Sequence, residues 1–596
     1  MAVKDEILQA SEPQTSSTVA ALDSREIQVQ ENDASVPESS SNLVEIPTWQ
    51  KIVLWISICL TSYANGLDNF TMSVYLNTAA SEFNGIVQYS TLAVVQSMIL
   101  AAGKPVFAKV ADVIGRAATL ALSVAVFTVG TVTISSSQNM GGLAAGMVFF
   151  SLGNTGVTFS LQLLVADLTS PRWRCAISNA LAIHFIINFG IASKITNALV
   201  PQSWRWGVGM FTIINPCVTG PIVAVLGWQQ YQSARRGAIR KYPYEGLGFS
   251  RSVWSFVVDV DLLGLTFFAG GFLLLLLPLT IADRAPDGYK SGYIVAMFVL
   301  GGVMLLLWPL VELRMPRPLV RLRTFFANPD VIVPASILFV DQFSVAMTMT
   351  PAFQWIEITH GWSTGDATYF LYTQSLCLVV FSVLAGSLAT YTGRYQRVCI
   401  AGACVRMIGL GLMLKYRTSH ATTFQVVIPQ VLMGLGGGLM TANVTVVAQA
   451  AVPHDELSIV TGFVLLVLEL GSAIGSATVG AVQQTLRASL HHYLEPITGG
   501  NATVVNLIYA QGSRAVAGFP LGTPIRDATV HAWSDIMHKL IVGALTLAAV
   551  NLVTCLVLPD HVLKDKQQNN VEDETVGIMP PQAVLPKSNR RAHREA

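Results

Sequence analysis

The segment AKVADVIGR at residues 108–116 returns in the second half of the chain as GSLATYTGR at residues 386–394. In both segments a small residue is followed seven positions later by Gly-Arg. Both also follow an apolar run that is long enough to cross a membrane as a helix. Internal duplication is typical of membrane proteins built from two similar helical bundles. The repeat predicts one structural element that is used twice.

The composition around these segments is that of a membrane protein. The chain has 596 residues, of which 52% are hydrophobic and only 12% charged, and its mean hydropathy is +0.53. Soluble domains usually carry about 25% charged residues, so an ordinary soluble enzyme is excluded. A formal net charge of +1 gives no reason to expect a nucleic-acid partner.

Long apolar segments recur through most of the chain. A hydrocarbon layer of about 30 Å needs about 20 apolar residues for each helical crossing. Fourteen segments meet this description, and they are predicted at 51–70, 90–110, 117–136, 142–166, 176–198, 206–229, 256–281, 291–312, 330–352, 368–391, 397–415, 424–450, 457–484 and 538–559.

Basic residues gather on alternate connections between these spans. One set of connections carries many Arg and Lys residues, among them Arg116, Arg172, Arg174, Arg235, Arg251, Arg314, Arg321 and Arg397. The opposite set is sparse. Because cytoplasmic loops carry the excess of Lys and Arg, the basic set is predicted to be cytoplasmic. With an even number of spans, both termini are then predicted to face the cytoplasm.

The repeated turn resembles the G-x-L-A-D-R-x-G-R signature of the major facilitator superfamily, with its first Gly and first Arg replaced. By this resemblance the cytoplasmic gate consists of Asp112, Gly115, Arg116, Gly393 and Arg394, with Asp112 and Arg116 in a charge lock between the two halves. The alternative is that these are solvated charges that only set topology.

Several further segments resemble the fungal siderophore-iron transporter family of that superfamily. They occur in the family's order: LDNFTMSVY (67–75), GKPVFAKVADVIGR (103–116), ADLTSPRWR (166–174), WRWGVGMF (204–211), YTGR (391–394), GLGGG (434–438) and HDE (454–456). Members that carry hydroxamate siderophores usually continue the first motif as Asp-Gly-Thr, whereas this chain has Asp68, Asn69 and Phe70. The solute expected is therefore another siderophore or another metabolite, as in the related glutathione exchangers.

The resemblance implies an all-α membrane protein with the major facilitator fold, in which two six-helix halves and two extra spans make fourteen transmembrane helices. The domains predicted are a disordered cytoplasmic tail (1–50), the N-terminal half (51–229), a cytoplasmic linker with the extra spans (230–312), five helices of the C-terminal half (313–484), an extracellular or lumenal loop (485–537), the last helix (538–559) and a disordered tail (560–596).

Ionisable residues at membrane depth are costly and commonly mark transport pathways. The candidates for proton coupling or for lining a cavity are Asp68, Lys104, Asp341, Arg406 and Glu469. Asp68 and Lys104 could pair with each other, and either Asp341 or Glu469 could be the coupling carboxylate. The alternative for each carboxylate is a structural one, as partner of Arg406 or of a backbone group.

Exterior aromatic residues give a second set of candidates. Tyr75, Trp362 and Tyr369 are candidates for a substrate vestibule, although an interfacial belt of Trp and Tyr would also explain exposed aromatics.

These observations predict a proton-coupled secondary transporter that imports a ferric siderophore or a related chelate by alternating access. The alternative is a fourteen-span antiporter that exports a drug or metabolite, including a glutathione-type exchanger. No GxxxxGK[ST] segment is present, so ATP is not expected to drive it. We expect no enzyme activity, cofactor, metal site or nucleic-acid partner. The expected partners are the solute, protons and the lipid bilayer, in the plasma membrane or an endosomal or vacuolar membrane.

Overall fold

A computed structural model describes residues 47–168, 184–200, 202–235, 248–259, 261–282, 285–315, 328–392, 395–450, 457–499 and 502–558. The chain divides into two units, Met1–Lys51 and Ile52–Ala596, and all contacts below lie within the second. The described residues form helices, turns and short links, without strands. Helices suit a bilayer because they satisfy their backbone hydrogen bonds internally.

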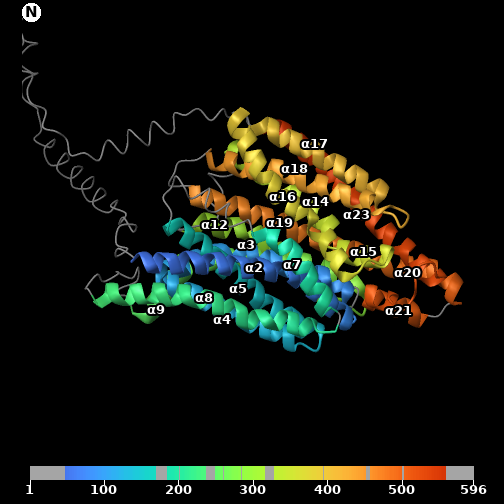
Figure 1. Ribbon diagram of the computed structural model, residues 1–596, viewed down its shortest axis with the longest axis horizontal. Helices are drawn as coiled ribbons and strands as arrows, with labels where there is room; N and C mark the ends of the chain where they lie inside the picture. The colour runs from blue at the N-terminus through green and yellow to red at the C-terminus, as the bar shows by residue number, and fades with distance from the viewer. Residues whose placement is uncertain are drawn as a thin grey trace, which may run out of the picture. The chain divides into compact units, whose positions relative to one another are not determined.

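Figure 1 shows the helices of the N-terminal half and of the C-terminal half as two bundles. The first bundle contains α2 (Thr48–Glu82), α3 (Tyr89–Ile114), α4 (Arg116–Ser136), α5 (Met140–Leu168), α7 (His184–Leu199) and α8 (Trp204–Arg235). The second contains α14 (Pro329–Met349), α15 (Ala352–His360), α16 (Thr364–Thr392), α17 (Tyr395–Tyr416), α18 (Thr423–Ala450), α19 (Leu457–Gln484), α20 (Leu486–Thr498), α21 (Ala502–Gln511), α22 (Ser513–Val516) and α23 (Pro524–Val557).

The segment between the bundles contains α9 (Phe249–Asp259), α10 (Leu262–Leu265), α11 (Gly271–Ile281) and α12 (Gly292–Arg314). Helix α11 packs against α3 of one half and α19 of the other, as well as against α12. Helix α12 exposes large apolar side chains, with Leu306 77% exposed. The inserted pair therefore covers one side of the contact between the halves and turns an apolar surface outward, as lipid contact requires.

Corresponding helix pairs in the two halves pack through glycine. A Cβ added to Gly130 of α4 would lie 2.2 Å from the backbone nitrogen of Phe150 in α5. A Cβ added to Gly436 of α18 would lie 2.6 Å from the carbonyl oxygen of Gly402 in α17. Small residues let membrane helices approach this closely. The α4–α5 and α17–α18 pairs follow the two repeated Gly-Arg segments, so the duplication seen in sequence extends to packing.

Twelve helical segments among the described residues are long and apolar enough to cross a membrane. A described helix also overlaps each of the fourteen predicted spans; α2 and α7, at the predicted spans 51–70 and 176–198, are the two not among the twelve. The chain is a multi-pass membrane protein. The tails 1–46 and 559–596 lie outside the described residues.

One boundary prediction is wrong. The segment 485–537 is not a long loop, because α20, α21 and α22 occupy much of it and α23 begins at Pro524 rather than at residue 538. Leu486, Leu490 and Leu494 recur at every fourth position and are fully buried, which is the periodicity of an amphipathic helix. A search for long apolar runs does not detect helices of this kind.

Candidate functional site

The two halves meet along α3 and α19 and along α7 and α16. Between α3 and α19, the hydroxyls of Ser97 and Ser472 are 3.1 Å apart. A Cβ added to Gly480 would lie 2.7 Å from Oγ of Ser90. The side chains at these positions are small, and the described ones make few hydrogen bonds across the contact. The two surfaces can therefore separate without unfolding either half.

Short polar contacts join α7 to the start of α16. The Ser193 hydroxyl donates to the carbonyl of Gly365 at 2.8 Å, and the Thr196 and Thr368 hydroxyls are 3.1 Å apart. The predicted vestibule residue Tyr369 belongs to the same contact, because its ring lies 5.1 Å from that of Phe189. The two halves are closed against each other here.

A second set of contacts closes the interface beside α15 and α22. Gln354 of α15 donates to the Ser81 hydroxyl of α2 at 3.4 Å and accepts from the backbone nitrogen of Ser513 at 3.0 Å. Arg514 of α22 lies 3.6 Å from a carboxylate oxygen of Glu82 at the end of α2. Together with a 2.9 Å hydrogen bond from the Gln511 amide of α21 to Asn84, these contacts connect the N-terminal half to the segment before α23.

Glu82 is also held within its own half. Its carboxylate accepts from the Trp204 indole at 2.8 Å and from Arg205 at 2.9 Å. Burial alone raises the pKa of Glu82, but the hydrogen bonds from Trp204 and Arg205 and the charges of Arg205 and Arg514 outweigh it and lower that pKa from its usual value. The ionised form of Glu82 therefore stabilises this closed end.

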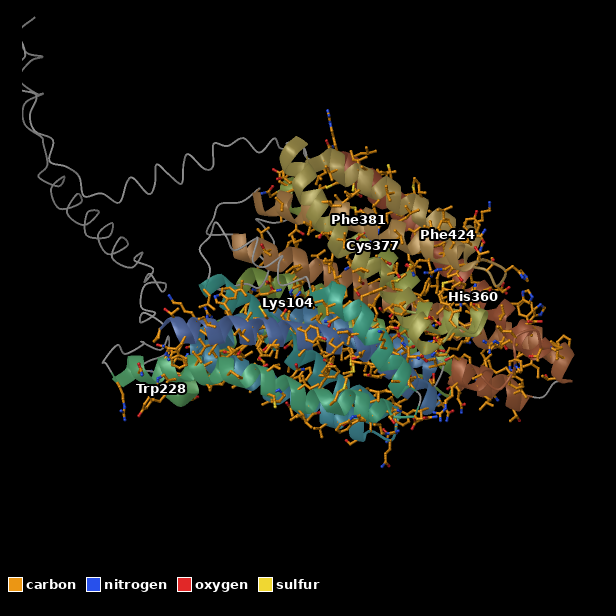
Figure 2. All side chains as sticks on the ribbon, viewed as in Figure 1. Lys104, Trp228, His360, Cys377, Phe381 and Phe424 are labelled. Atoms are coloured by element: carbon orange, nitrogen blue, oxygen red, sulfur yellow. The ribbon has the colours of Figure 1, made fainter. Side chains whose placement is uncertain are left out.

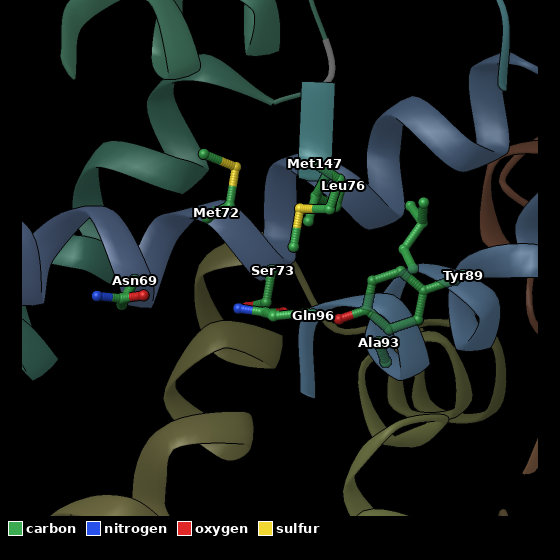
Figure 3. A pocket seen from close by; sticks show the side chains of 9 residues that line it. Asn69, Met72, Ser73, Leu76, Tyr89, Ala93, Gln96 and Met147 are labelled. Carbon is green, nitrogen blue, oxygen red and sulfur yellow. The ribbon is translucent and has the colours of Figure 1, made fainter. Parts of the chain in front are cut away.

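A pocket lies between α2, α3 and α5, next to this closed end (Figure 3). Its polar side chains are neutral, and they include those of Ser73, Gln96 and Tyr89, which Figure 3 labels. From the other half, the Tyr372 hydroxyl of α16 hydrogen-bonds to Ser73 and donates to the carbonyl of Asn69 at 3.3 Å. The nine lining residues are Asn69, Met72, Ser73, Leu76, Tyr89, Leu92, Ala93, Gln96 and Met147.

Asp68 lies on another face of α2. Its side chain is fully buried, and neither carboxylate oxygen has a hydrogen-bond partner among the described residues. Tyr75, two turns further on, is 1% exposed, and its ring would meet a Cβ added to Gly207 of α8 at 2.5 Å. Asp68 and Tyr75 therefore face the interior of the N-terminal half.

The predicted pairing of Asp68 with Lys104 is wrong. Lys104 of α3 instead lies 3.7 Å from Glu469 of α19, and Figure 2 labels it beside the C-terminal bundle. Both side chains keep some contact with solvent, with 28% exposure for Lys104 and 16% for Glu469. This ion pair joins the two halves. Which residue Lys104 contacts depends on how α3 is rotated about its axis, and the spacing of residues along the chain does not reveal that rotation.

Asp341 and Arg406 form an ion pair inside the C-terminal half, between α14 and α17. Their side chains are only 2% and 4% exposed. Ser344 and Asn551 line a small pocket next to the pair. The structure thus gives Asp341 the structural partner that the sequence offered as one alternative.

The remaining predicted site residues do not come together. Trp362 is half-buried against the core of the C-terminal half, with its ring 6.0 Å from that of Phe370, and it is not grouped with Tyr75 and Tyr369. Gly115 has a φ of +91° at the break between α3 and α4, a conformation that favours glycine. The side chain of Asp112 and residues 393–394 lie outside the described residues.

Sequence reasoning missed most of the residues that close the interface. Asn197 also joins α7 to α16, because its side-chain oxygen accepts from the backbone nitrogen of Gly365 at 3.3 Å. Ser193 and Asn197 lie four residues apart on the predicted span 176–198, and this polar spacing on an apolar helix was a usable signal. Gln354 and Glu82 gave no comparable signal. In the described part of the chain, no group of three or more His, Cys, Asp or Glu side chains could hold a metal ion.

Comparison with known proteins gives the same fold. Residues 335–559 match the family model of the Major Facilitator Superfamily. A bacterial homologue of the human lysosomal transporter Spinster, in an inward-facing and occupied conformation, covers 86% of this chain and 97% of its own at a TM-score of 0.52 and 12% identity. The match to the peptide transporter POT covers 84% of this chain and 94% of that protein, with a TM-score of 0.53 and 11% identity. At such identities the likeness concerns the fold alone.

Relatives of similar length extend over most of the sequence. Siderophore iron transporter mirC of Emericella nidulans is 29% identical over 529 residues, or 88% of this chain and 86% of its own. MFS siderochrome iron transporter C of Aspergillus fumigatus is 29% identical over 91% of this chain and 88% of its own. Low affinity heme transporter str3 of Schizosaccharomyces pombe is 29% identical over 87% of this chain and 83% of its own. The chain is thus similar to the major facilitator superfamily over residues 335–559, and over most of its length it is similar to fungal siderophore-iron transporters.

Proposed function

We propose that the chain is a proton-coupled secondary transporter that imports a ferric siderophore or a related organic chelate by alternating access. The observation that carries the proposal is the closed end of the interface, where the α7–α16, Gln354 and Glu82–Arg514 contacts join the halves. Each contact can break without unfolding a bundle. Full-length relatives named as siderophore transporters support the solute class.

In this proposal the membrane is crossed fourteen times, by the twelve long apolar segments described above and by α2 and α7 of the N-terminal half. Both termini and the basic connections face the cytoplasm. The closed end then faces outward, and opening it admits the solute. Gly115 and Arg116 belong to the opposite, cytoplasmic gate, together with Asp112, Gly393 and Arg394.

The pocket between α2, α3 and α5 is proposed as part of the solute path. Its neutral donors and acceptors on Asn69, Ser73, Tyr89 and Gln96 can bind the polar groups of a chelate. Tyr372 makes the pocket sensitive to closure, because its hydroxyl reaches Ser73 only while the halves are together. Solute that displaces this bond separates the halves.

Lys104 and Glu469 are proposed as the proton-coupling pair. An ion pair that bridges the halves weakens when its carboxylate takes up a proton, so protonation of Glu469 favours one arrangement of the halves over the other. Asp341 and Arg406 lack this property, since both belong to one half. Asp68 stays a second candidate, because an ionised carboxylate without a partner is costly in such surroundings.

The test is uptake of radioactive iron from several defined ferric siderophores by yeast that lacks its own carriers. Surface-expressed wild-type chain is expected to take up at least one chelate, and a protonophore is expected to abolish that uptake. The Glu469→Gln variant should lose the protonophore-sensitive part. Surface expression without uptake of any chelate would contradict the proposal and point to export or exchange of a metabolite.

A second candidate solute is haem. The relative str3 is named a low-affinity haem transporter and matches this chain at the same 29% identity as the siderophore transporters. Haem is therefore included as a separate arm of the uptake assay. If the chain takes up haem and none of the siderophores, the proposed alternating access would stand, and haem would replace the siderophore as the proposed solute.

A further inference from the structure

Exposed aromatic side chains mark both ends of α8. Trp206 near its start is 61% exposed, and Trp228 near its end is 53% exposed. They are separated by 22 residues (228 minus 206), or about 33 Å of helix, close to the roughly 30 Å of a hydrocarbon layer. Trp and Tyr concentrate at the two membrane–water boundaries. Trp206 and Trp228 therefore lie at opposite boundaries.

The Trp228 end of α8 also carries a phenol and a guanidinium. Tyr231 is 49% exposed, and its ring centroid lies 6.0 Å from that of Trp228. The guanidinium carbon of Arg235 lies 4.8 Å from the Tyr231 ring centroid. Figure 2 shows Trp228 at this end of the helix. One positive charge is thus held over the Tyr231 ring, which itself lies against Trp228, at the membrane boundary.

Helix α9 lies at the same boundary. It has 11 residues, or about 16 Å, too few to cross the bilayer, and it comes between the end of α8 and the start of the next crossing at Leu262. Val253 and Trp254 are 46% and 69% exposed. Arg251 is exposed as well. This is the pattern of a helix that lies in the interface, with apolar side chains toward the lipid.

We propose that two groups of side chains at the same membrane boundary, Trp228, Tyr231 and Arg235 of α8 and Arg251 and Trp254 of α9, make up a surface that binds anionic phospholipid headgroups, such as those of phosphatidylserine. The two guanidiniums supply charge-assisted hydrogen bonds to the phosphate and carboxylate, and the indoles and the phenol sit at headgroup level. By the distribution of basic residues, this surface faces the cytoplasmic leaflet, where anionic lipid is concentrated. The surface is separate from the solute path.

The test uses the purified full-length chain in detergent, titrated with fluorescent phosphatidylserine or phosphatidylcholine. Wild type is expected to bind phosphatidylserine more tightly. Each basic side chain near an anionic surface contributes about fivefold to binding, so the Arg235→Gln/Arg251→Gln double variant should bind phosphatidylserine at least tenfold more weakly. Phosphatidylcholine binding should change by less than twofold.

The matched control is Lys290→Gln/Lys415→Gln, which removes two exposed charges at the opposite boundary and should leave the lipid preference unchanged. Arg235→Lys/Arg251→Lys keeps both charges and should retain most of the preference, which distinguishes lost binding from misfolding. Equal affinity of wild type for the two lipids would overturn the proposal. Unaltered phosphatidylserine binding by the folded Gln double variant would also overturn it. That result would indicate that these residues contact a protein partner instead of lipid.

Discussion

Two ion pairs in this molecule differ in what they connect. Asp341 and Arg406 are almost fully buried and join α14 to α17 within the C-terminal half, whereas Lys104 and Glu469 are partly exposed and join α3 of one half to α19 of the other. The rocking of the halves that we propose would leave the first pair intact and separate the second. The first is therefore suited to holding a bundle together, and the second to responding to a proton.

The difference also explains why a list of charged residues at membrane depth does not identify the coupling site. All four residues are ionisable and lie on apolar helices, so the sequence ranks them alike. Only their partners separate a structural role from a coupling role. The predictions below test that separation, from the largest expected effect to the smallest.

Arg406→Met should destabilise the protein most. It leaves the Asp341 carboxylate buried without its cation, which costs about 3–5 kcal/mol, so both thermal stability in detergent and surface expression should fall sharply. The double variant Asp341→Asn/Arg406→Gln removes both charges and should recover more than half of the loss. Wild-type stability in the single variant would show that the pair does not hold the bundle.

Glu469→Gln should leave stability nearly unchanged, by less than about 1 kcal/mol for a partly exposed pair, but should reduce protonophore-sensitive uptake by about tenfold or more. Exchange of solute down its own gradient should persist, because the path itself is intact. Asp366→Asn, which alters an exposed carboxylate on α16, is the control and should behave as wild type. Full proton-driven uptake by Glu469→Gln would move the coupling site elsewhere, with Asp68 next.

Tyr372→Phe should have a moderate effect on the solute path. The variant loses the hydroxyl that reaches Ser73 and the Asn69 carbonyl, and a neutral hydrogen bond contributes about 1 kcal/mol. The expected change in the KM for uptake is therefore about fivefold. Because Ser73→Ala removes the same bond, the two substitutions should combine less than additively. Additive effects would show that the two hydroxyls act independently.

Glu82→Gln should have the smallest effect, visible as a change in pH dependence. The pKa of Glu82 is lowered in the folded chain, so its stabilising contribution is present above the ordinary pKa of a glutamate and is lost as the pH falls through the lowered value. Thermal stability of wild type should drop between pH 7 and pH 3, by up to about 1 kcal/mol from this residue. The drop should be smaller in Glu82→Gln. An identical drop in both proteins would assign it to other carboxylates.

Much of the fold was predictable from local features of the chain. Apolar runs of sufficient length, such as 117–136 and 397–415, become helices wherever they occur, because a bilayer offers the backbone no other hydrogen-bond partners. The repeated Gly-Arg segment likewise predicted two related halves. The helices α20 and α21 were missed because their apolar residues recur with helical period instead of forming a long run.

The sequence by itself determined that this is a multi-pass helical protein related to siderophore transporters, since hydropathy and short motifs are properties of contiguous residues. The tertiary structure alone decided that Lys104 meets Glu469 rather than Asp68 and that Gln354 and Glu82 close one end of the interface. The physical reason is rotation. A helix places successive side chains about 100° apart around its axis, so the partner of a charged residue depends on how each helix is turned against its neighbours.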